Sequence, residues 1–309
     1  MKKLEPAAVP TFYFIGVTTE KSSIMKVFPR WMEILELGIV ELKGVDLPLH
    51  AAPELYREVT AFIKNDPLSV GALVTTHKLD LFAACEDLFD EIDPFANTLR
   101  EVSSLSKKDG KFCAHAKDPI SSGLALESFV PEKFWNKYEG EVLLLGAGGS
   151  ALAMSLYFTQ EKFIGNIPRR ITIANRSQPR LEDAREKLAS RGNITFVHNP
   201  YPSENDVLIE NLPPYSLVVN ATGLGKDAPG SPTTDNVNYP ENTLVWEINY
   251  RGDLLFMRQA QAQAKEKNLH IEDGWIYFIH GWLQVIGEVF HIDIGKSQLE
   301  ILSRAAKAI

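Results

Sequence analysis

The sequence predicts an α/β protein built from two strand-and-helix domains. Apolar strand-like runs alternate with amphipathic helical segments over residues 12–115, and the alternation resumes at residue 142. The run 142–145 is unbroken and apolar, which is typical of a parallel strand buried on both faces. A chain of 309 residues is long enough for about two domains. The expected division is 1–123, 124–272 and 273–309, the last being helices that return to the first domain.

The first domain is expected to alternate three strands with three helices. The strands are predicted at 12–17, 39–45 and 70–75, and the helices at 22–35, 54–63 and 79–89. Asp109-Gly110 is a strong turn signal between the strand-like runs 102–105 and 111–115. The domain is therefore expected to close with a hairpin on one edge of its sheet.

The second domain is expected to hold a mainly parallel sheet, because its strand-like runs are again separated by helical segments. A helix at 121–127 and a polar bridge at 132–140 precede it. Its strands are predicted at 142–145, 171–174, 194–197, 216–220 and 244–248, with helices at 154–158, 181–190 and 254–267. Two further helices, 275–290 and 296–308, end the chain.

The turn after the first strand of the second domain carries the pattern Gly-x-Gly-x-x-Ala. Its residues are Gly146, Ala147, Gly148, Gly149, Ser150 and Ala151. The first glycine permits the tight bend, the second lets the backbone approach a pyrophosphate, and the small Ala151 lets helix and strand pack closely. The helix N-terminus offers free N–H groups to phosphates. The pattern indicates a doubly wound, Rossmann-type dinucleotide-binding domain; an ordinary strand-to-helix turn is the alternative.

The end of the next strand indicates which dinucleotide is bound. An NAD site usually has Asp or Glu here to accept from the ribose 2′-hydroxyl. This chain has the neutral Asn175 instead, followed by Arg176, Ser177 and Arg180. Two guanidinium groups can each fork onto the oxygens of a 2′-phosphate, and the serine adds a hydroxyl donor. NADP is therefore predicted over NAD, with two solvated arginines near a helix start as the alternative.

Composition excludes several other classes. The net charge of −8 and the pI of about 5.5 argue against nucleic-acid binding, which needs a basic face. Cys85 and Cys113 have no metal-site spacing and are expected to be reduced core residues, and no metal is expected. The first ten residues lack the apolar segment of a signal peptide, and no apolar run approaches a membrane span. A cytoplasmic protein with no membrane or nucleic-acid partner, monomeric or homodimeric, is the expectation.

Several separated motifs together resemble the shikimate dehydrogenase family, over most of the chain. They are the glycine turn, Asn175-Arg176-Ser177 with Arg180, the loop Asn220-Ala-Thr-Gly-Leu-Gly225, Val74-Thr75-Thr76-His77-Lys78, and Asp118 eight residues after Gly110. The resemblance implies a hydride transfer with Lys78 and Asp118 as catalytic residues, and a place in aromatic amino acid biosynthesis. It places Asn220, Ala221, Thr222 and Gly223 near the nicotinamide, and Gly274 beside the cofactor.

The substrate positions implied by the resemblance depart from the family pattern. Ser22 fits the first serine of the family's Ser-x-Ser, but Ile24 replaces the second. Ser103 stands at a substrate-binding Asn, Ala116 replaces another Asn, and the usual Gln falls on Gly281 beside His280. The Lys78 segment lacks a proline and is one residue short. The substrate-binding candidates are Ser22, Thr75, Ser103, Tyr250 and His280; helix-cap, strand-face or core roles are their alternatives.

The predicted chemistry is an NADP-dependent reduction or oxidation on a hydroxylated cyclic carboxylate such as 3-dehydroshikimate or shikimate. Lys78 is a suitable proton donor to the carbonyl oxygen, and Asp118 could hold that ammonium and bind a neighbouring hydroxyl. His77 and His115 lie near in sequence and could shuttle protons. The lost substrate-site residues leave two alternatives open: a nucleotide- or ligand-binding relative without turnover, or an oxidoreductase acting on another carbonyl or an imine.

Overall fold

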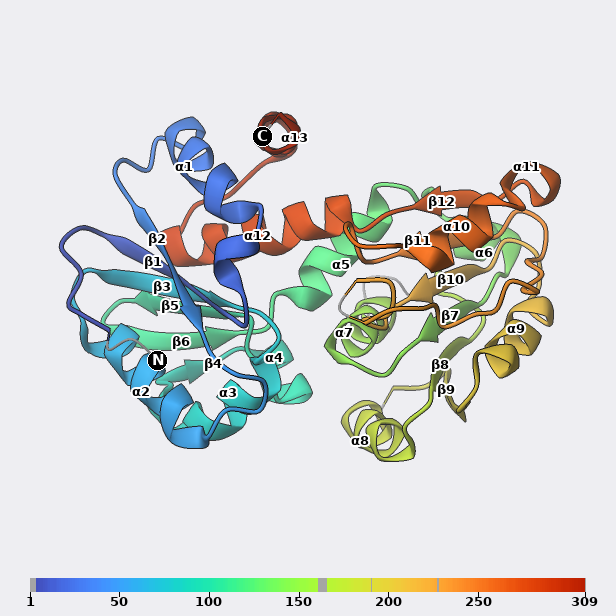
Figure 1. The fold of residues 1–309 in the computed structure, drawn as a ribbon, viewed down its shortest axis with the longest axis horizontal. Helices are drawn as coiled ribbons and strands as arrows, with labels where there is room; N and C mark the ends of the chain where they lie inside the picture. Colours follow the sequence, from blue (N-terminus) through green and yellow to red (C-terminus); the bar gives the residue numbers. More distant parts are fainter. Residues whose placement is uncertain (1–3, 161–165, 190, 227, 309) are drawn as a thin grey trace. The chain divides into compact units, whose positions relative to one another are not determined.

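The computed structural model describes residues 4–160, 166–189, 191–226 and 228–308. It divides into two compact units, one of residues 1–117 with 281–309 and one of residues 118–280 (Figure 1). Helix α5 (Asp118–Glu127) is part of the second unit, although the sequence suggested a boundary at 123/124. A Cβ at Gly123 would lie 2.2 Å from the ring of Tyr157, so this glycine lets α5 pack tightly on α7 (Gly149–Phe158).

The first unit contains a six-stranded mixed sheet in the order β2-β1-β3-β5-β6-β4. Its strands are β1 (Thr11–Gly16), β2 (Glu41–Asp46), β3 (Ser69–Val74), β4 (Glu91–Ile92), β5 (Ser104–Lys108) and β6 (Lys111–His115). Strand β1 pairs in parallel with β2 and β3, while β5 and β6 form the antiparallel hairpin that Asp109-Gly110 predicted. Contrary to the expectation from the sequence, the hairpin does not form the edge of the sheet, because the two-residue strand β4 pairs outside β6.

Helices cover both faces of this first sheet. They are α1 (Ile24–Ile34), α2 (Pro53–Asn65), α3 (Lys78–Cys85), α4 (Pro94–Leu99), the part of α12 (Trp275–Phe290) from Gly281 onward, and α13 (Lys296–Lys307), with short 3-10 turns η1 (Thr19–Lys21) and η2 (Glu86–Leu88). Successive residues of β1 point to opposite faces. Phe12 and Phe14 contact Trp282 of α12, whereas Tyr13 contacts Phe62 of α2.

From Gly281 onward the C-terminal helices belong to the first unit, whereas the sequence suggested a boundary at 272/273. Trp31 of α1 is fully buried and donates from Nε1 to the carbonyl of Leu302 in α13 at 2.9 Å. This bond fixes α13 against α1 by a contact between residues that are remote in sequence. Cys85 and Cys113 are both buried and unbridged, which confirms their prediction as core residues.

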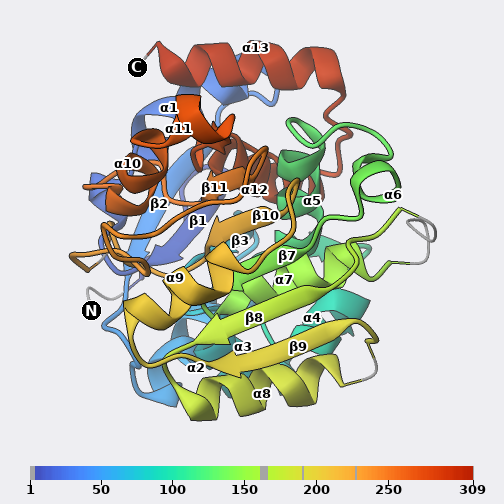
Figure 2. The ribbon, with the colours of Figure 1, turned by 90° about the vertical axis from the view of Figure 1, so that its right-hand side faces the viewer.

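The second unit contains a six-stranded sheet in which all strand pairs are parallel (Figure 2). The order is β12-β11-β10-β7-β8-β9, with β7 (Val142–Leu145), β8 (Ile171–Asn175), β9 (Ile194–His198), β10 (Leu217–Asn220), β11 (Leu244–Glu247) and β12 (His270–Glu272). The chain runs outward from β7 in one direction, then returns to β10 and runs outward in the other. This is the doubly wound arrangement predicted from the sequence.

The helices of the second unit are α5, α6 (Phe134–Tyr138), α7, α8 (Gln178–Leu188), α9 (Pro202–Glu210), α10 (Leu255–Gln261) and α11 (Ala264–Lys267), with α12 starting at Trp275. One face of the sheet forms a buried core with α9 and α10. Leu143 and Leu145 of β7 pack there with Ile209 of α9 and Phe256 of α10. In Figure 1, α7 and α8 lie on the other side of this sheet from α9.

The sequence missed several short elements. Helix α6 interrupts the expected polar bridge at 132–140, and β4, α4, α9 and β12 were not predicted. The helix expected at 254–267 is instead two, because α10 ends at Gln261 and α11 starts at Ala264. Within the described ranges, every helix is too short or too polar to cross a membrane.

Candidate functional site

The predicted cofactor-site residues of the second unit lie where its parallel strands end. Successive strands are added to one side of β7 and then, from β10 onward, to the other, and ligands of open α/β sheets bind at such switch points, beyond the carboxyl ends of the strands. Gly146 follows β7, Arg176 follows β8, and Ala221 follows β10. The structure thus brings the glycine turn, the arginine segment and the Asn220 loop to one edge of one sheet.

The first two glycines of the turn, Gly146 and Gly148, have different roles. Gly146 has φ +113°, and a Cβ there would lie 2.7 Å from the carbonyl oxygen of Ala221, so the fold itself requires glycine. Gly148 is extended, and a Cβ there would meet no protein atom within 4 Å. Its open side faces space that a ligand can use, just before α7 starts with its free N–H groups. Ala147 and Ala151 are buried, whereas Gly149 and Ser150 are half-buried.

The segment after β8 exposes two cations. Arg176 and Arg180 are both exposed, and neither guanidinium forms an ion pair with another residue that the structure describes. Asn175 donates from its amide to the carbonyl of Ser177 at 3.2 Å, which shapes the turn before α8. The first turn of α8 contains no acidic residue. A cation in the first turn of a helix opposes the helix dipole, so the segment favours an anionic ligand.

The loop after β10 is held by a buried polar network. Asn220 Oδ1 accepts from the Thr222 amide at 3.0 Å and from the Thr222 hydroxyl at 2.6 Å. The amide of Ala221 donates to Leu145 O at 2.8 Å, which joins the loop to β7. Asn220 Nδ2 donates to Glu247 Oε2 at 2.6 Å, and Asn249 Nδ2 donates to Glu247 Oε1 at 2.6 Å. Sequence reasoning found the loop but missed Glu247, whose only local signal is an acid at the end of an apolar strand.

Two buried groups of the second unit have strongly shifted acid–base properties. Burial raises the pKa of Glu247 to about 7, even though hydrogen bonds from Asn249 and Asn220 and the charge of Lys226 act in the opposite direction. Burial lowers the pKa of His280 to about 4. His280 is therefore neutral at neutral pH, and as a substrate ligand it would offer a neutral ring nitrogen rather than a cation.

These shifts predict opposite pH dependences of stability. Glu247 contributes stability that is present below its ordinary pKa and lost as pH rises through about 7. His280 contributes stability that is present above its ordinary pKa and lost as pH falls through about 4. Relative to wild type, Glu247→Gln should gain about 3 kcal/mol of unfolding free energy as pH rises from about 4.5 to 7, and His280→Gln should gain a similar amount as pH falls from about 6.5 to 4.

Urea unfolding of the three proteins across this pH range measures the effect. Other titrating groups are common to all three proteins, so the differences between variant and wild type isolate the two residues. Difference curves that stay flat with pH would show that neither group changes its proton affinity on folding.

Asp118 is linked to the glycine turn within the second unit. It is the first residue of α5, and its Oδ2 lies 3.5 Å from the hydroxyl of Tyr277 on α12. The same hydroxyl lies 3.3 Å from Oγ of Ser150 at the start of α7. Tyr277 was not predicted as a site residue. It connects the expected catalytic carboxylate to the segment expected to bind phosphate.

Lys78 belongs to the first unit, where it is the first residue of α3. Thr76, just before it, has φ +58°, a left-handed conformation that is rare and strained for a β-branched residue. His77 is buried, with Nδ1 3.0 Å from the Tyr56 hydroxyl and Nε2 3.2 Å from Gly16 O. Those contacts occupy both ring nitrogens of His77, so it anchors the turn. This turn fixes where the Lys78 side chain starts.

The three other candidates of the first unit differ in their surroundings. Ser103 is buried, donates to His115 O at 3.4 Å and accepts from Lys117 N at 2.7 Å, so it shapes the chain before Asp118. Thr75 follows β3 and donates from its amide to Ile15 O at 3.0 Å. Ser22 is half-buried at the end of η1. Ile24, at the position of the missing serine, is a fully buried core residue.

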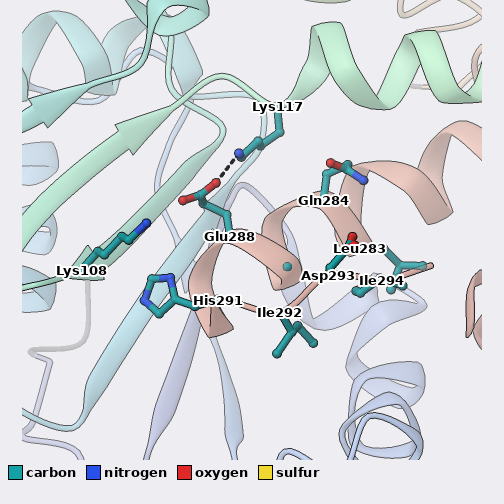
Figure 3. A pocket seen from close by; sticks show the side chains of 10 residues that line it. Lys108, Lys117, Leu283, Gln284, Glu288, His291, Ile292, Asp293 and Ile294 are labelled. Atoms are coloured by element: carbon teal, nitrogen blue, oxygen red, sulfur yellow. Dashed lines mark hydrogen bonds and ion pairs between the residues drawn. The ribbon is translucent and has the colours of Figure 1, made fainter.

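A polar cavity of about 360 Å³ lies in the first unit, and none of the predicted site residues lines it (Figure 3). Lys117 pairs with Glu288 of α12 at its wall, as the dashed line shows. Burial alone would raise the pKa of Glu288, but the hydrogen bond from Lys117 and the charge of His115 hold it below its ordinary value. His115 lies 3.3 Å from Glu288 and 3.6 Å from Asp93, so it belongs to this ion-pair cluster.

Two further candidates, Tyr250 and Gly274, lie next to the start of α12, within the second unit. Tyr250 packs on Phe278 and Trp275, with ring centroids 4.5 and 5.8 Å apart. A Cβ at Gly274 would lie 2.0 Å from Ile248 O, so this glycine allows α12 to begin close against the end of β11. The described ranges contain no group of three or more His, Cys, Asp or Glu side chains arranged to hold a metal ion.

Known proteins of similar sequence are shikimate dehydrogenases. The NADP(+) shikimate dehydrogenase of Bacillus cereus strain B4264 is 27% identical over 228 residues, which cover 74% of this chain and 75% of that protein. The corresponding enzyme of Bacillus anthracis strain CDC 684 is 28% identical over the same shares. No protein-family model matches the chain.

Solved structures of the same fold include two well-matched relatives. Shikimate 5-dehydrogenase from Thermus thermophilus, in complex with NADP(H) and shikimate, has a TM-score of 0.70 at 21% identity and covers 96% of this chain and 99% of its own. Quinate dehydrogenase from Corynebacterium glutamicum, in complex with NAD, has a TM-score of 0.74 at 17% identity and covers 97% and 99%. The resemblance predicted from separated motifs is confirmed: in sequence and in fold, the chain is shikimate dehydrogenase-like.

Proposed function

We propose that the protein is an NADP-dependent oxidoreductase of the shikimate dehydrogenase type. It would transfer a hydride between NADP(H) and a ring alcohol or ketone of a hydroxylated cyclic carboxylate, such as shikimate and 3-dehydroshikimate or a close analogue. The observation that carries the proposal is the edge of the second sheet. There, a glycine turn that is open at Gly148 lies beside a strand end that has two exposed arginines and no carboxylate.

The residues of this edge fit NADP. The pyrophosphate would lie against Gly148 and the N-terminus of α7, where backbone N–H groups and the helix dipole favour anions. Arg176, Arg180 and Ser177 would hold the 2′-phosphate. The related folds include one solved with NADP(H) and one with NAD, so the fold alone does not select between them. The side chains favour NADP over NAD, because a guanidinium pair suits a phosphate and an NAD site usually has a carboxylate.

The chain's own residues would supply orientation and the proton. NADPH brings the hydride when bound. The Lys78 ammonium would donate to the carbonyl oxygen of the substrate and stabilise the alkoxide that develops there. Asp118 would bind a neighbouring hydroxyl of the substrate. The strained turn at Thr76 supports this role, because strain of this kind persists only where the surrounding structure enforces it.

The substrate class rests on the relatives, which are named for shikimate and quinate. Two local differences suggest a modified ring substituent. Ile24 offers no hydroxyl where the family has a second serine, and the Ser103 hydroxyl is engaged with backbone groups. An enzyme acting on a close analogue of shikimate is consistent with both differences. We place this enzyme in the cytoplasm.

A substrate screen tests the proposal. The purified protein is mixed with shikimate, quinate and a panel of hydroxylated ring acids, with NADP⁺ or NAD⁺, and reduced nucleotide is followed by its absorbance. Substrate-dependent reduction of NADP⁺ is expected. If NADPH binds in calorimetry but no ring alcohol is oxidised, the protein is instead a nucleotide-binding relative without this activity.

Removing the two guanidinium groups should change nucleotide preference. In Arg176→Ala/Arg180→Ala, the KM for NADP⁺ should rise by about a hundredfold or more, because each charged hydrogen bond contributes about 1.5–3 kcal/mol. The KM for NAD⁺, which lacks the 2′-phosphate, should change little. Arg185→Ala is the matched control, since Arg185 lies on the same helix but stacks on Phe196. Equal losses for the two nucleotides would contradict the assignment of a 2′-phosphate site.

A further inference from the structure

Glu247 is a carboxylate enclosed by donors. It ends β11, is 0% exposed, and its two oxygens accept three hydrogen bonds. Asn220 Nδ2 donates to Oε2 at 2.6 Å, while Asn249 donates to Oε1 from its backbone amide at 2.9 Å and from Nδ2 at 2.6 Å. Burying a carboxylate costs several kcal/mol unless such donors compensate. This group lies at the edge of the sheet that also carries the glycine turn and the Asn220 loop.

The carboxylate determines how the two amide side chains are oriented. Above its pKa of about 7 the Glu247 carboxyl is ionised and only accepts hydrogen bonds, so it then requires the NH₂ group of each asparagine to point toward it. The oxygen of Asn220 must then point the other way, where it accepts from both the amide and the hydroxyl of Thr222. A flipped Asn220 amide would lose these bonds and present its NH₂ group to two donors.

The same network reaches the remainder of the loop. Asn249 Nδ2 also lies 3.4 Å from Thr222 O and 3.3 Å from Leu224 O. The carbonyl of Ala221 borders Gly146, since a Cβ there would lie 2.7 Å from that oxygen. A nucleotide seated on the glycine turn would therefore lie beside the segment that Glu247 orders.

We propose that Glu247 is a positioning residue for the nucleotide: through Asn220 and Asn249 it fixes the backbone of Thr222–Leu224 in the conformation that receives the nicotinamide end of the cofactor. This inference rests on the proposed function. Two charged or titratable neighbours of Glu247, Lys226 and Tyr239, affect its electrostatic environment. Lys226 favours its ionised form, and the buried Tyr239, whose pKa burial raises, remains neutral nearby.

Two substitutions of Glu247 separate its charge and geometry from its bulk. Glu247→Gln keeps the size, but its NH₂ group must face one of the three donors, so at least one asparagine loses its orientation. Glu247→Asp keeps the carboxylate one methylene further back and should recover part of the function. Glu241→Gln is the matched control, because Glu241 is exposed near the other end of the same strand.

The first measurement is amide hydrogen exchange of segment 220–225 in the nucleotide-free protein. Exchange should be faster in Glu247→Gln than in wild type, with Glu247→Asp intermediate and Glu241→Gln unchanged. The second measurement is NADPH affinity by calorimetry, which should fall roughly tenfold in Glu247→Gln, as expected for the loss of one or two net hydrogen bonds. In turnover, the KM for nucleotide should rise while the KM for the ring substrate stays constant.

The outcomes distinguish the two levels of the proposal. If Glu247→Gln lowers the unfolding free energy but leaves loop exchange and NADPH affinity at wild-type values, the residue is structural only and the positioning role is overturned. If wild type itself binds no NADPH, the proposed function fails instead, and the exchange data still report whether Glu247 orders the loop.

Discussion

Lys78→Ala should reduce turnover by about a thousandfold or more while leaving NADPH affinity near the wild-type value. The Lys78 ammonium can donate a proton to a developing alkoxide and keep a positive charge beside it. The left-handed backbone of Thr76 fixes where the Lys78 side chain begins, and this enforced local geometry supports a role in the reaction.

Steady-state kinetics and NADPH calorimetry of the same preparation measure this effect. Lys26→Ala is the control, since Lys26 is an exposed lysine on α1 of the same unit. Turnover within about threefold of wild type would remove Lys78 from the reaction. Loss of NADPH binding together with turnover would indicate a damaged fold rather than lost chemistry, and the unfolding free energy would identify that case.

Valine substitutions at Gly146 and Gly148 should have different consequences. Gly148→Val should unfold at nearly the wild-type urea concentration but bind NADPH roughly a hundredfold more weakly, because its side chain enters open space where backbone N–H groups would meet phosphate oxygens. Gly146→Val should lose several kcal/mol of stability, because the residue has φ +113° and its Cβ would collide with Ala221 O.

Urea unfolding and NADPH titration of both variants test this contrast. The pair is internally controlled, since the two positions lie two residues apart in the same turn and receive the same side chain. A stable Gly146→Val protein would contradict the close approach of the Ala221 loop. A Gly148→Val protein that binds NADPH normally would show that the pyrophosphate does not use the turn.

The elements that were predicted correctly have a strong local pattern. Strand β7 is a run of four apolar residues, and α12 was predicted with the bounds that the structure shows. Helix α9 was missed because its hydrophobic pattern is weak. Its local signals were Pro202 at the first helical position and Glu204, whose carboxylate accepts from the Tyr201 amide at 3.0 Å. Strand β4 has two residues and exists only because β6 provides its partner.

The candidate site residues also divide into those with a local sequence pattern and those without one. The glycine turn and the arginine segment were predictable because their geometry depends on residues adjacent in sequence. Glu247, Tyr277 and the pair Lys117–Glu288 were not, because they depend on contacts between residues 27, 127 and 171 positions apart; only the contact of Glu247 with Asn249 is local. A glutamate after an apolar strand has no local feature that distinguishes a solvated carboxylate from one enclosed by two asparagines.

The dinucleotide-binding turn and the arginines that indicate NADP could be predicted from residue types at short spacings. The fold class and the resemblance to shikimate dehydrogenases could be predicted from patterns and motifs along the chain. Three-dimensional packing was needed to show that Gly146 is required by the fold while Gly148 faces open space, that Ser103 is engaged with backbone groups, and that Glu247 accepts a hydrogen bond from Asn220. The physical reason is that burial and hydrogen-bond partners depend on which distant segments pack together, and that information is not contained in local sequence patterns.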